Sequence, residues 1–344
     1  MRSTRALMLA GAFLGGAAGG WAAASRARRG RFCFRDRVVL ISGGSRGLGL
    51  VLARQFAAEG SRLALAARNE HELNAAADEL RKSGAEVLAL ACDVRDREQV
   101  NEAVHRTVAR YGRLDVLINN AGIIQVGPFE HMTVSDFEDS LAVHLFGPLY
   151  FTLAARAHLR RSPGGGRMVN ISSVGGKIAV PHLLPYTVGK FALTGFSEGL
   201  RAELKRRNTF VTTVCPGLMR TGSPRNAIFK GKHRLEYAWF AISDSLPLLS
   251  VDAERAARRI IEACRRGQSR LVIGAQTKAA VLLNEVFPGA SAAVRAFANR
   301  LLPGPGRAGR SAWTGERSNS RLADGWLTRA SNTAARRNNE LFAH

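Results

Sequence analysis

Tyr186 and Lys190 enclose the segment Tyr-Thr-Val-Gly-Lys, and Ser173 lies thirteen residues before the tyrosine. Residues four apart on a helix share one face, so an ammonium group would lie beside a phenol. A free tyrosine has a pKa near ~10, and a neighbouring cation favours the ionised phenol and lowers that pKa. A serine hydroxyl at the same place could hydrogen-bond a substrate oxygen. The three side chains therefore predict proton transfer on a carbonyl or an alcohol.

A glycine-rich turn, Ser42-Gly-Gly-Ser-Arg-Gly-Leu-Gly49, follows the apolar residues 38–41 and precedes a helical stretch at 50–58. A strand, a glycine turn and a helix N-terminus form a phosphate site, because backbone N–H groups and the helix dipole converge on the anion. The glycines remove side chains that would block this approach. The turn predicts a nucleotide site, with an ordinary strand-to-helix turn as the alternative.

These two motifs, in this order and separation, resemble those of the short-chain dehydrogenase/reductase family. Four further segments match family motifs in register, namely Asp93-Val94, Asn119-Asn-Ala-Gly122, Ile171-Ser-Ser173, and Pro216-Gly217 with Thr221. The resemblance covers roughly residues 36–275. It implies an NAD(P)-dependent oxidoreductase that interconverts a carbonyl and an alcohol by hydride transfer.

The resemblance also implies roles for individual residues. Tyr186 would exchange its proton with the substrate oxygen, Ser173 would hydrogen-bond that oxygen, and Lys190 would also bind the nicotinamide ribose. Asp93 would contact the adenine, and Asn120 would line the cofactor cleft. The implied cofactor contacts are Gly43, Ser45, Arg46, Gly47, Leu48, Gly49, Asp93, Val94, Asn120, Ala121, Gly122, Tyr186, Lys190, Pro216, Gly217 and Thr221, the last three at the nicotinamide carboxamide.

One position departs from the family pattern. The family has a fourth catalytic residue, an asparagine in a V-N-x-x-G context, where this chain has Val143-His144-Leu-Phe-Gly147. If the asparagine acts through its backbone carbonyl, His144 keeps the relay and adds pH sensitivity near its own pKa of ~6.5. If the side chain is needed, turnover falls. An active enzyme is the leading interpretation, and a dinucleotide-binding sensor or scaffold with impaired catalysis is the alternative.

Seven short apolar segments alternate with helical stretches along the middle of the chain. The segments are 38–41, 63–67, 87–91, 114–118, 168–171, 211–214 and 271–273, and the helical stretches include 70–81, 97–111, 135–160 and 186–206. Unalternating apolar runs suit strands that are buried on both faces of a parallel sheet. The pattern predicts a doubly wound, Rossmann-type α/β domain with helices on both faces of a mostly parallel seven-stranded sheet.

The end of the second apolar segment bears on the choice of cofactor. It reads Ala66-Ala67-Arg68-Asn69, without the carboxylate that would bind the adenosine ribose and repel a 2′-phosphate. Arg46 and Arg68 could hold such a phosphate through their forked donors. NADP(H) is therefore the expected cofactor and NAD(H) the alternative.

The residues between Thr221 and Ser250 bear on the substrate. This stretch contains Ile228, Phe229, Tyr237, Trp239, Phe240 and Ile242. In the family the matching segment forms a flap over the substrate, which here implies a lipophilic ketone, aldehyde or alcohol. Packing of these side chains on the domain itself explains them equally well. His182, four residues before Tyr186, is a further candidate for facing the substrate.

The first 35 residues form an apolar segment and a basic linker. Residues 6–24 carry no charge, and arginines flank them on both sides. Nineteen residues can just span a bilayer core of ~30 Å, although most of these are Ala and Gly. The interpretations are a membrane anchor that leaves the catalytic domain in the cytoplasm, a cleaved export signal ending near 22–24, and an extension of a soluble cytoplasmic protein.

The chain continues beyond the catalytic domain at 36–275. Residues 277–287 and 291–302 read as two short apolar helices within an extension at 276–302. They could pack on the domain, line the substrate entrance or touch a membrane surface. Residues 303–344 are rich in Gly, Arg, Ser and Asn, which predicts a disordered basic tail apart from a helix near 334–342.

The net charge of +23 raises the question of a nucleic-acid partner. Residues 1–37 hold eight arginines against one acid, and residues 300–344 hold eight against three. No basic stripe interleaved with aromatics accompanies this charge, so solvated charge is favoured over nucleic-acid or membrane-surface binding. The four cysteines and eight histidines lack metal-ligand spacing, so no catalytic metal is expected. A small-molecule substrate is the expected partner, and a homo-oligomer is compatible with this interpretation.

Overall fold

The computed structural model describes residues 32–246, 250–306, 309–319 and 328–341. The chain divides into two units, Met1–Cys33 and Phe34–His344, and the fold considered is that of the second. The expected membrane anchor at 6–24 lies outside the described residues. Within the described ranges, none of the helices combines the length and the apolar character that a membrane span requires.

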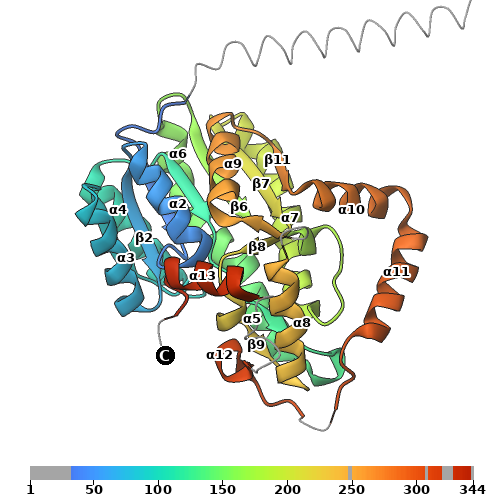
Figure 1. Ribbon diagram of the computed structural model, residues 1–344. Coiled ribbons are helices and arrows are strands. Elements are labelled where there is room, and N and C mark those ends of the chain that lie inside the picture. The colour runs from blue at the N-terminus through green and yellow to red at the C-terminus, as the bar shows by residue number, and fades with distance from the viewer. Residues whose placement is uncertain (1–31, 247–249, 307–308, 320–327, 342–344) are drawn as a thin grey trace, which may run out of the picture. The chain divides into compact units, whose positions relative to one another are not determined.

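A seven-stranded parallel sheet forms the centre of the second unit (Figure 1). Its strands are β1 (Val38–Ser42), β2 (Arg62–Ala67), β3 (Val87–Ala91), β4 (Val116–Asn119), β6 (Gly166–Ile171), β7 (Thr209–Pro216) and β11 (Arg270–Ile273). The order across the sheet is β11-β7-β6-β4-β1-β2-β3, and every pairing is parallel. All residues of β1, β4 and β6 are buried, including Arg167 and Asn170 of β6, which is typical of strands covered on both faces. The predicted fold class is confirmed.

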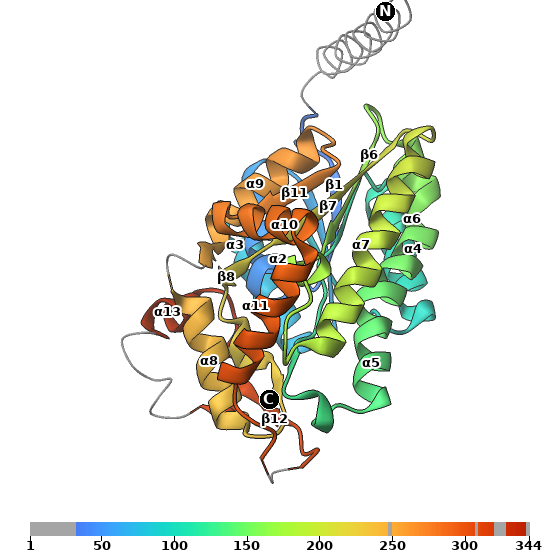
Figure 2. The same ribbon diagram turned by 90° about the vertical axis from the view of Figure 1, so that its right-hand side faces the viewer.

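Helices cover both faces of this sheet, as Figure 2 shows. One face carries α2 (Gly47–Ala58), α3 (Glu70–Lys82) and α9 (Ala253–Arg265), and the other carries α4 (Arg97–Tyr111), α6 (Gly147–Arg161) and α7 (Leu184–Lys205). Asn69 and Asp96 cap α3 and α4 by accepting backbone N–H groups of the first turn. The two layers bring the carboxyl ends of the parallel strands to one edge of the domain.

The helix predicted over 135–160 is not continuous. The structure has α5 (Val134–Leu141), a π-helical turn at Ala142–Phe146 and then α6. A π turn inserts one residue into the helical ladder and is frequent at functional sites. His144 lies within this turn and is buried there.

The segment after the sheet also differs from expectation. The two predicted apolar helices are present as α10 (Ala275–Val286) and α11 (Pro288–Leu301), but α11 buries none of its residues. The predicted disordered tail contains β12 (Trp313–Thr314), α12 (Gly315–Ser318) and α13 (Arg329–Arg337). β12 pairs with β9 (Ile228–Phe229), which pairs in turn with β5 (Gln125–Val126). The helix expected near 334–342 corresponds to α13, which begins and ends five residues earlier.

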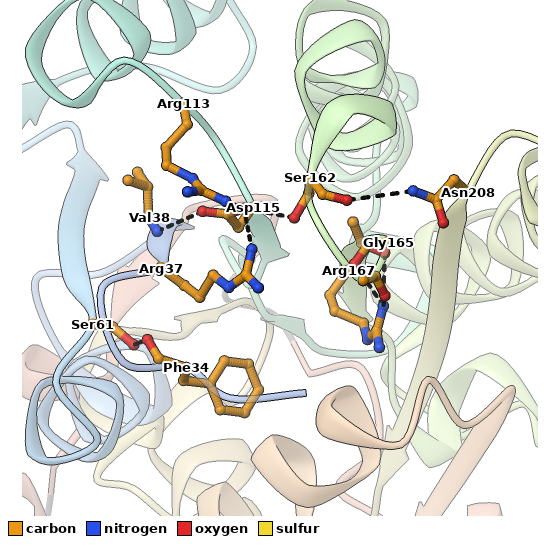
Figure 3. Close-up of polar contacts among 12 residues, drawn as sticks. Phe34, Arg37, Val38, Ser61, Arg113, Asp115, Ser162, Gly165, Arg167 and Asn208 are labelled. Carbon is orange, nitrogen blue, oxygen red and sulfur yellow. Dashed lines mark hydrogen bonds and ion pairs between the residues drawn. The ribbon is translucent and has the colours of Figure 1, made fainter. Parts of the chain in front are cut away.

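Asp115 forms a buried polar centre at the amino end of β4 (Figure 3). Its carboxylate accepts hydrogen bonds from the Val38 amide at 3.0 Å, from Arg37 at 3.2 Å and from Arg113 at 2.6 Å, and it also accepts one from Ser162. Burial raises the pKa of Asp115, but these donors outweigh burial and hold the pKa below its ordinary value. The centre ties three segments together at the edge of the sheet opposite the carboxyl ends of its strands.

We predict that Asp115→Ala lowers the free energy of unfolding by about 3–5 kcal/mol, because two arginines lose their buried partner. Urea denaturation of the purified protein measures this change. The matched control is Asp78→Ala, which removes an exposed ion pair with Arg81 and should cost less than about 1 kcal/mol. The folded pKa of Asp115 lies below 3.8, so its contribution is complete above that pH and is lost on further acidification. Equal effects of the two variants would contradict this account.

Candidate active site

A cavity of about 750 Å³ opens at the carboxyl ends of the strands. Almost all of the predicted site residues line it together. They are Gly43, Ser45, Arg46, Gly47, Leu48, Arg68, Asp93, Val94, Asn120, Ala121, Gly122, His144, Ser173, Tyr186, Lys190, Pro216, Gly217 and Thr221. Gly49 is the exception: a side chain there would collide with the backbone of Gly43, so its role is close packing of α2 on the turn.

Ser173 and Tyr186 meet at one wall of this cavity. Ser173 follows β6 and begins a short 3₁₀ turn, where its hydroxyl accepts the Gly175 amide at 3.0 Å. The same hydroxyl hydrogen-bonds Tyr186, which lies in the first turn of α7. Gly175 leaves room for the phenol, since a Cβ there would lie 3.1 Å from the tyrosine ring. The pair can therefore engage one substrate oxygen together.

The pKa of Tyr186 differs from the expected direction. Burial raises it to about 12, and the hydrogen bond from Ser173 opposes that rise only in part. The net lowering that the sequence predicts does not occur, because loss of water around the phenol outweighs the stabilisation of its ionised form. The phenol is consequently protonated at neutral pH, which suits a proton donor in carbonyl reduction.

Lys190 lies one turn further along α7 and is buried. Its Nζ donates to the backbone oxygen of Ile171 at 2.9 Å and lies 5.6 Å from the centre of the Tyr186 ring. Burial lowers the pKa of Lys190 to about 7. The amine is thus charged below about pH 7 and largely neutral above it, so it is a titrating group at physiological pH.

His144 is fully buried beside the phenol. Its ring meets the Tyr186 ring edge to face, with the centroids 5.5 Å apart. Nε2 accepts the Ile123 amide at 3.3 Å, so the proton of the neutral ring lies on Nδ1, which is 3.2 Å from the Ser140 hydroxyl. Burial and the nearby charge of Lys190 hold the pKa of His144 well below its ordinary value. The expected pH sensitivity near ~6.5 therefore does not arise from this ring.

The glycine turn has the geometry of a dinucleotide site. Gly43 has φ of +65°, and a Cβ there would lie 2.9 Å from the backbone of Ala121. Asn120 donates its side-chain amide to the backbone oxygens of Ser42 and Gly43, which joins the turn after β1 to the loop after β4. The first turn of α2 contains no acidic residue and has no side-chain cap. These residues fit an anionic cofactor approaching the helix N-terminus.

The two arginines expected to hold a 2′-phosphate differ in their surroundings. Arg68 is exposed and lines the cavity. Arg46 donates to Glu72 at 3.0 Å and to Asn226 at 3.1 Å, and its Nε lies 3.7 Å from Glu340. The predicted phosphate site of two arginines is therefore only partly present, because Arg46 already faces the carboxylates of Glu72 and Glu340.

Sequence reasoning missed the polar residues around Arg46. Glu72 is buried in the first turn of α3, and Glu340 is buried in the C-terminal segment. Asn226 lies in a 3₁₀ turn, and all three residues line the cavity. Glu72 had a signal, since Asn69 followed by an acid three residues later marks a helix start. Glu340 had none, because it lies nearly 300 residues from the glycine turn.

Most of the remaining cavity wall is apolar, and its apolar residues are Ile123, Ile124, Val174, Leu183, Leu218, Met219, Ile228 and Phe240. Polar residues also line it, namely Asn69, Ser172, Ser223, Asp244 and Thr314. Phe229 and Tyr237 instead pack edge to face in a buried cluster. The aromatics of 221–250 therefore divide between the substrate side and the interior. His182 does not line the cavity, because its ring pairs with the buried carboxylate of Glu236 at 2.9 Å on α8 (His233–Ser245).

Comparisons with known proteins found related sequences and structures. The profile of the family described as short chain dehydrogenase matches residues 37–228. An oxidoreductase named YxnA from Bacillus subtilis is 32% identical over 260 residues, which cover 74% of this chain and 70% of that protein. A putative ketoacyl reductase from Streptomyces coelicolor is 38% identical over 189 residues, which cover 54% and 72%. The crystal structure of levodione reductase superposes with a TM-score of 0.62 at 28% identity, covering 72% of this chain and 99% of that one.

Proposed function

The chain belongs to the short-chain dehydrogenase family, and from that premise we propose that it interconverts a carbonyl and an alcohol on a lipophilic small molecule with NADP(H). The observation that carries the proposal is the meeting of Ser173, Tyr186 and Lys190 at one wall of a cavity whose other end is the glycine turn. When bound, the nicotinamide supplies the hydride that the carbonyl carbon receives.

The side chains supply the proton and hold the oxygen. In reduction, the Tyr186 hydroxyl donates its proton to the oxygen as negative charge develops there. Ser173 donates a hydrogen bond to the same oxygen and fixes its position. The Lys190 ammonium lies near the phenol and stabilises the phenolate left behind. Neutral His144 holds the Ile123 amide and the π turn in place behind the tyrosine.

The apolar wall supports a lipophilic substrate. Ile123, Leu183 and Phe240 offer apolar contact surface to a substrate. The test is NADPH oxidation by the purified full chain with aliphatic, aromatic and polycyclic carbonyls of increasing size. Turnover that rises with apolar surface supports the proposal. Cofactor binding without turnover on any carbonyl would instead support the dinucleotide-binding sensor.

The preference for NADP(H) rests on Arg68. Its guanidinium is exposed at the cavity rim, at the end of β2 where an acidic residue would select NAD(H). We predict that Arg68→Asp lowers the ratio of kcat/KM for NADPH over NADH by at least about tenfold, because a carboxylate repels the 2′-phosphate. Steady-state kinetics with both cofactors measures the ratio. Arg106→Asp, an exposed arginine of α4, is the control, and an unchanged ratio in Arg68→Asp would count against the assignment.

A further inference from the structure

The C-terminal segment crosses between the two sides of the cofactor site. The Asn338 backbone oxygen accepts the Gly47 amide at 2.9 Å, and the Asn339 side chain donates to the Ser45 backbone oxygen at 3.4 Å. Asn338 also approaches the Thr221 backbone oxygen at 3.5 Å. Figure 1 shows α13 beside the start of α2 and near β8 (Leu218–Arg220). The segment thus joins the glycine turn to the loop after β8.

Shape and polar contacts seat this segment on the domain. Ala335 is fully buried against Gly222, which has φ of +94°. A side chain at position 222 would collide with Ala335. Arg225 donates to Asn332 at 3.0 Å, and Ser331 donates to Asp244 at 3.2 Å. Contacts of this kind specify one position of α13 and the residues that follow it.

Glu340 places a carboxylate at the anion site of the glycine turn. A Cβ on Gly47 would lie 2.5 Å from its Oε1, so the carboxylate occupies the space that the glycine leaves open. Asn226 donates to Oε2, and Arg46 faces the same oxygen at 3.7 Å. Arginine, an amide and a helix N-terminus are the groups that bind phosphate. Glu340 lines the same cavity as Tyr186.

We propose that Glu340 is an affinity-determining residue of the cofactor site, which competes from the C-terminal segment for the position of a cofactor phosphate. The inference rests on the proposed function, because it requires a nicotinamide dinucleotide as the ligand of this cleft. The competitor is tethered, so cofactor binding must displace the Glu340 side chain or neutralise it.

The charges around Glu340 support this competition. Arg46 on the glycine turn attracts it, while Glu72 on α3 and Asp244 on α8 repel it. Glu72 and Glu340 both face the single guanidinium of Arg46, so a phosphate is disfavoured there. Burial raises the pKa of Glu340 to about 7, and Arg46 opposes that rise. The carboxylate therefore ionises, and competes more strongly, as the pH increases through about 7.

The test compares the full-length protein with Glu340→Gln, which keeps the shape and removes the charge. Dissociation constants for NADH are measured by fluorescence at pH 6 and pH 8, since NADH lacks the 2′-phosphate that titrates near ~6. We expect Glu340→Gln to bind NADH more tightly than the wild type does, by about tenfold at pH 8 and by a smaller factor at pH 6. Lys190 titrates in both proteins, so its effect on NADH binding cancels when the two dissociation constants at the same pH are divided. Equal or weaker binding by the variant would overturn the proposal.

Glu316→Gln is the matched control, because Glu316 is an exposed glutamate of the same C-terminal region. It should bind NADH as the wild type does. Hydrogen–deuterium exchange of the wild type gives a readout that needs no variant. Saturating NADH should speed exchange of the amides at 329–341, whereas slower exchange would mean that the segment clamps the cofactor and would overturn the competition. A wild type that binds neither NADH nor NADPH would refute the proposed function itself.

Discussion

Replacing Tyr186 with phenylalanine is expected to lower kcat for carbonyl reduction by about 10²–10⁴-fold while leaving the dissociation constant for NADPH unchanged. Among the residues that the structure describes, Tyr186 carries the only phenolic hydroxyl that lines the cavity. The substitution removes it and keeps the ring that packs edge to face against His144. Because the pKa of Tyr186 is about 12, the wild type keeps its proton throughout the neutral range. Single-turnover kinetics with NADPH, alongside equilibrium binding, separates the chemical step from cofactor affinity.

Tyr150→Phe is the control for this experiment, because Tyr150 lies on α6 and does not line the cavity. It should retain the wild-type kcat. If Tyr186→Phe kept more than a tenth of the wild-type kcat, another group would be the proton donor, and the assigned role of the tyrosine would be wrong.

Lys190→Met is expected to lower kcat/KM for reduction by about 10²–10³-fold, because the variant loses the charge that stabilises the developing phenolate. The pH profile gives a second readout. Burial lowers the pKa of Lys190 to about 7, so the ammonium is present below that pH and lost above it. Wild-type kcat/KM for reduction should therefore fall as the pH rises through about 7, and the variant should lose this step.

Lys177→Met provides the comparison for Lys190, since Lys177 is paired with Glu198 at the surface. Its pH profile should match that of the wild type. A Lys190→Met variant with the same inflection near pH 7 as the wild type would show that another group titrates there.

The sheet and most of the site could be predicted because their signals are local. Unalternating apolar segments identify strands buried on both faces, and in a parallel sheet the residues after successive strands meet at one edge. Ser173 after β6 and Tyr186 in α7 therefore meet although the chain between them is irregular. Glycines with positive φ, such as Gly43, mark the turn in the same direct way.

The protonation states could not be predicted from spacing. A Tyr-x-x-x-Lys pattern places an amine near a phenol, but it gives no measure of how much water burial removes. In the structure, burial dominates for Tyr186, for Lys190 and for His144. The π turn at Ala142–Phe146 was also hidden, because its residues are compatible with an ordinary α-helix and only tertiary packing selects the wider turn.

The position of the C-terminal segment was the largest difference. Its Arg, Asn and Gly content is typical of a disordered tail, and composition does not show which surface of the domain a segment contacts. Asn338 and Asn339 bind through backbone groups and short amides, which leave no periodic pattern in the sequence. Spacing therefore predicts a phosphate partner for Arg46, but it does not show that Glu72 and Glu340 also face this arginine.

The most direct measurement of the central claim is isotope transfer from the cofactor to the product. The full-length protein is incubated with NADPH in which both hydrogens of the reactive ring carbon are replaced by deuterium, together with a carbonyl that supports turnover, and the alcohol is analysed by mass spectrometry. We expect one deuterium on the former carbonyl carbon with wild type and at least about 10²-fold less labelled product per unit time with Tyr186→Phe. Unlabelled alcohol from the wild type, or equal labelling rates in the two proteins, would contradict hydride transfer at a site where Tyr186 supplies the proton.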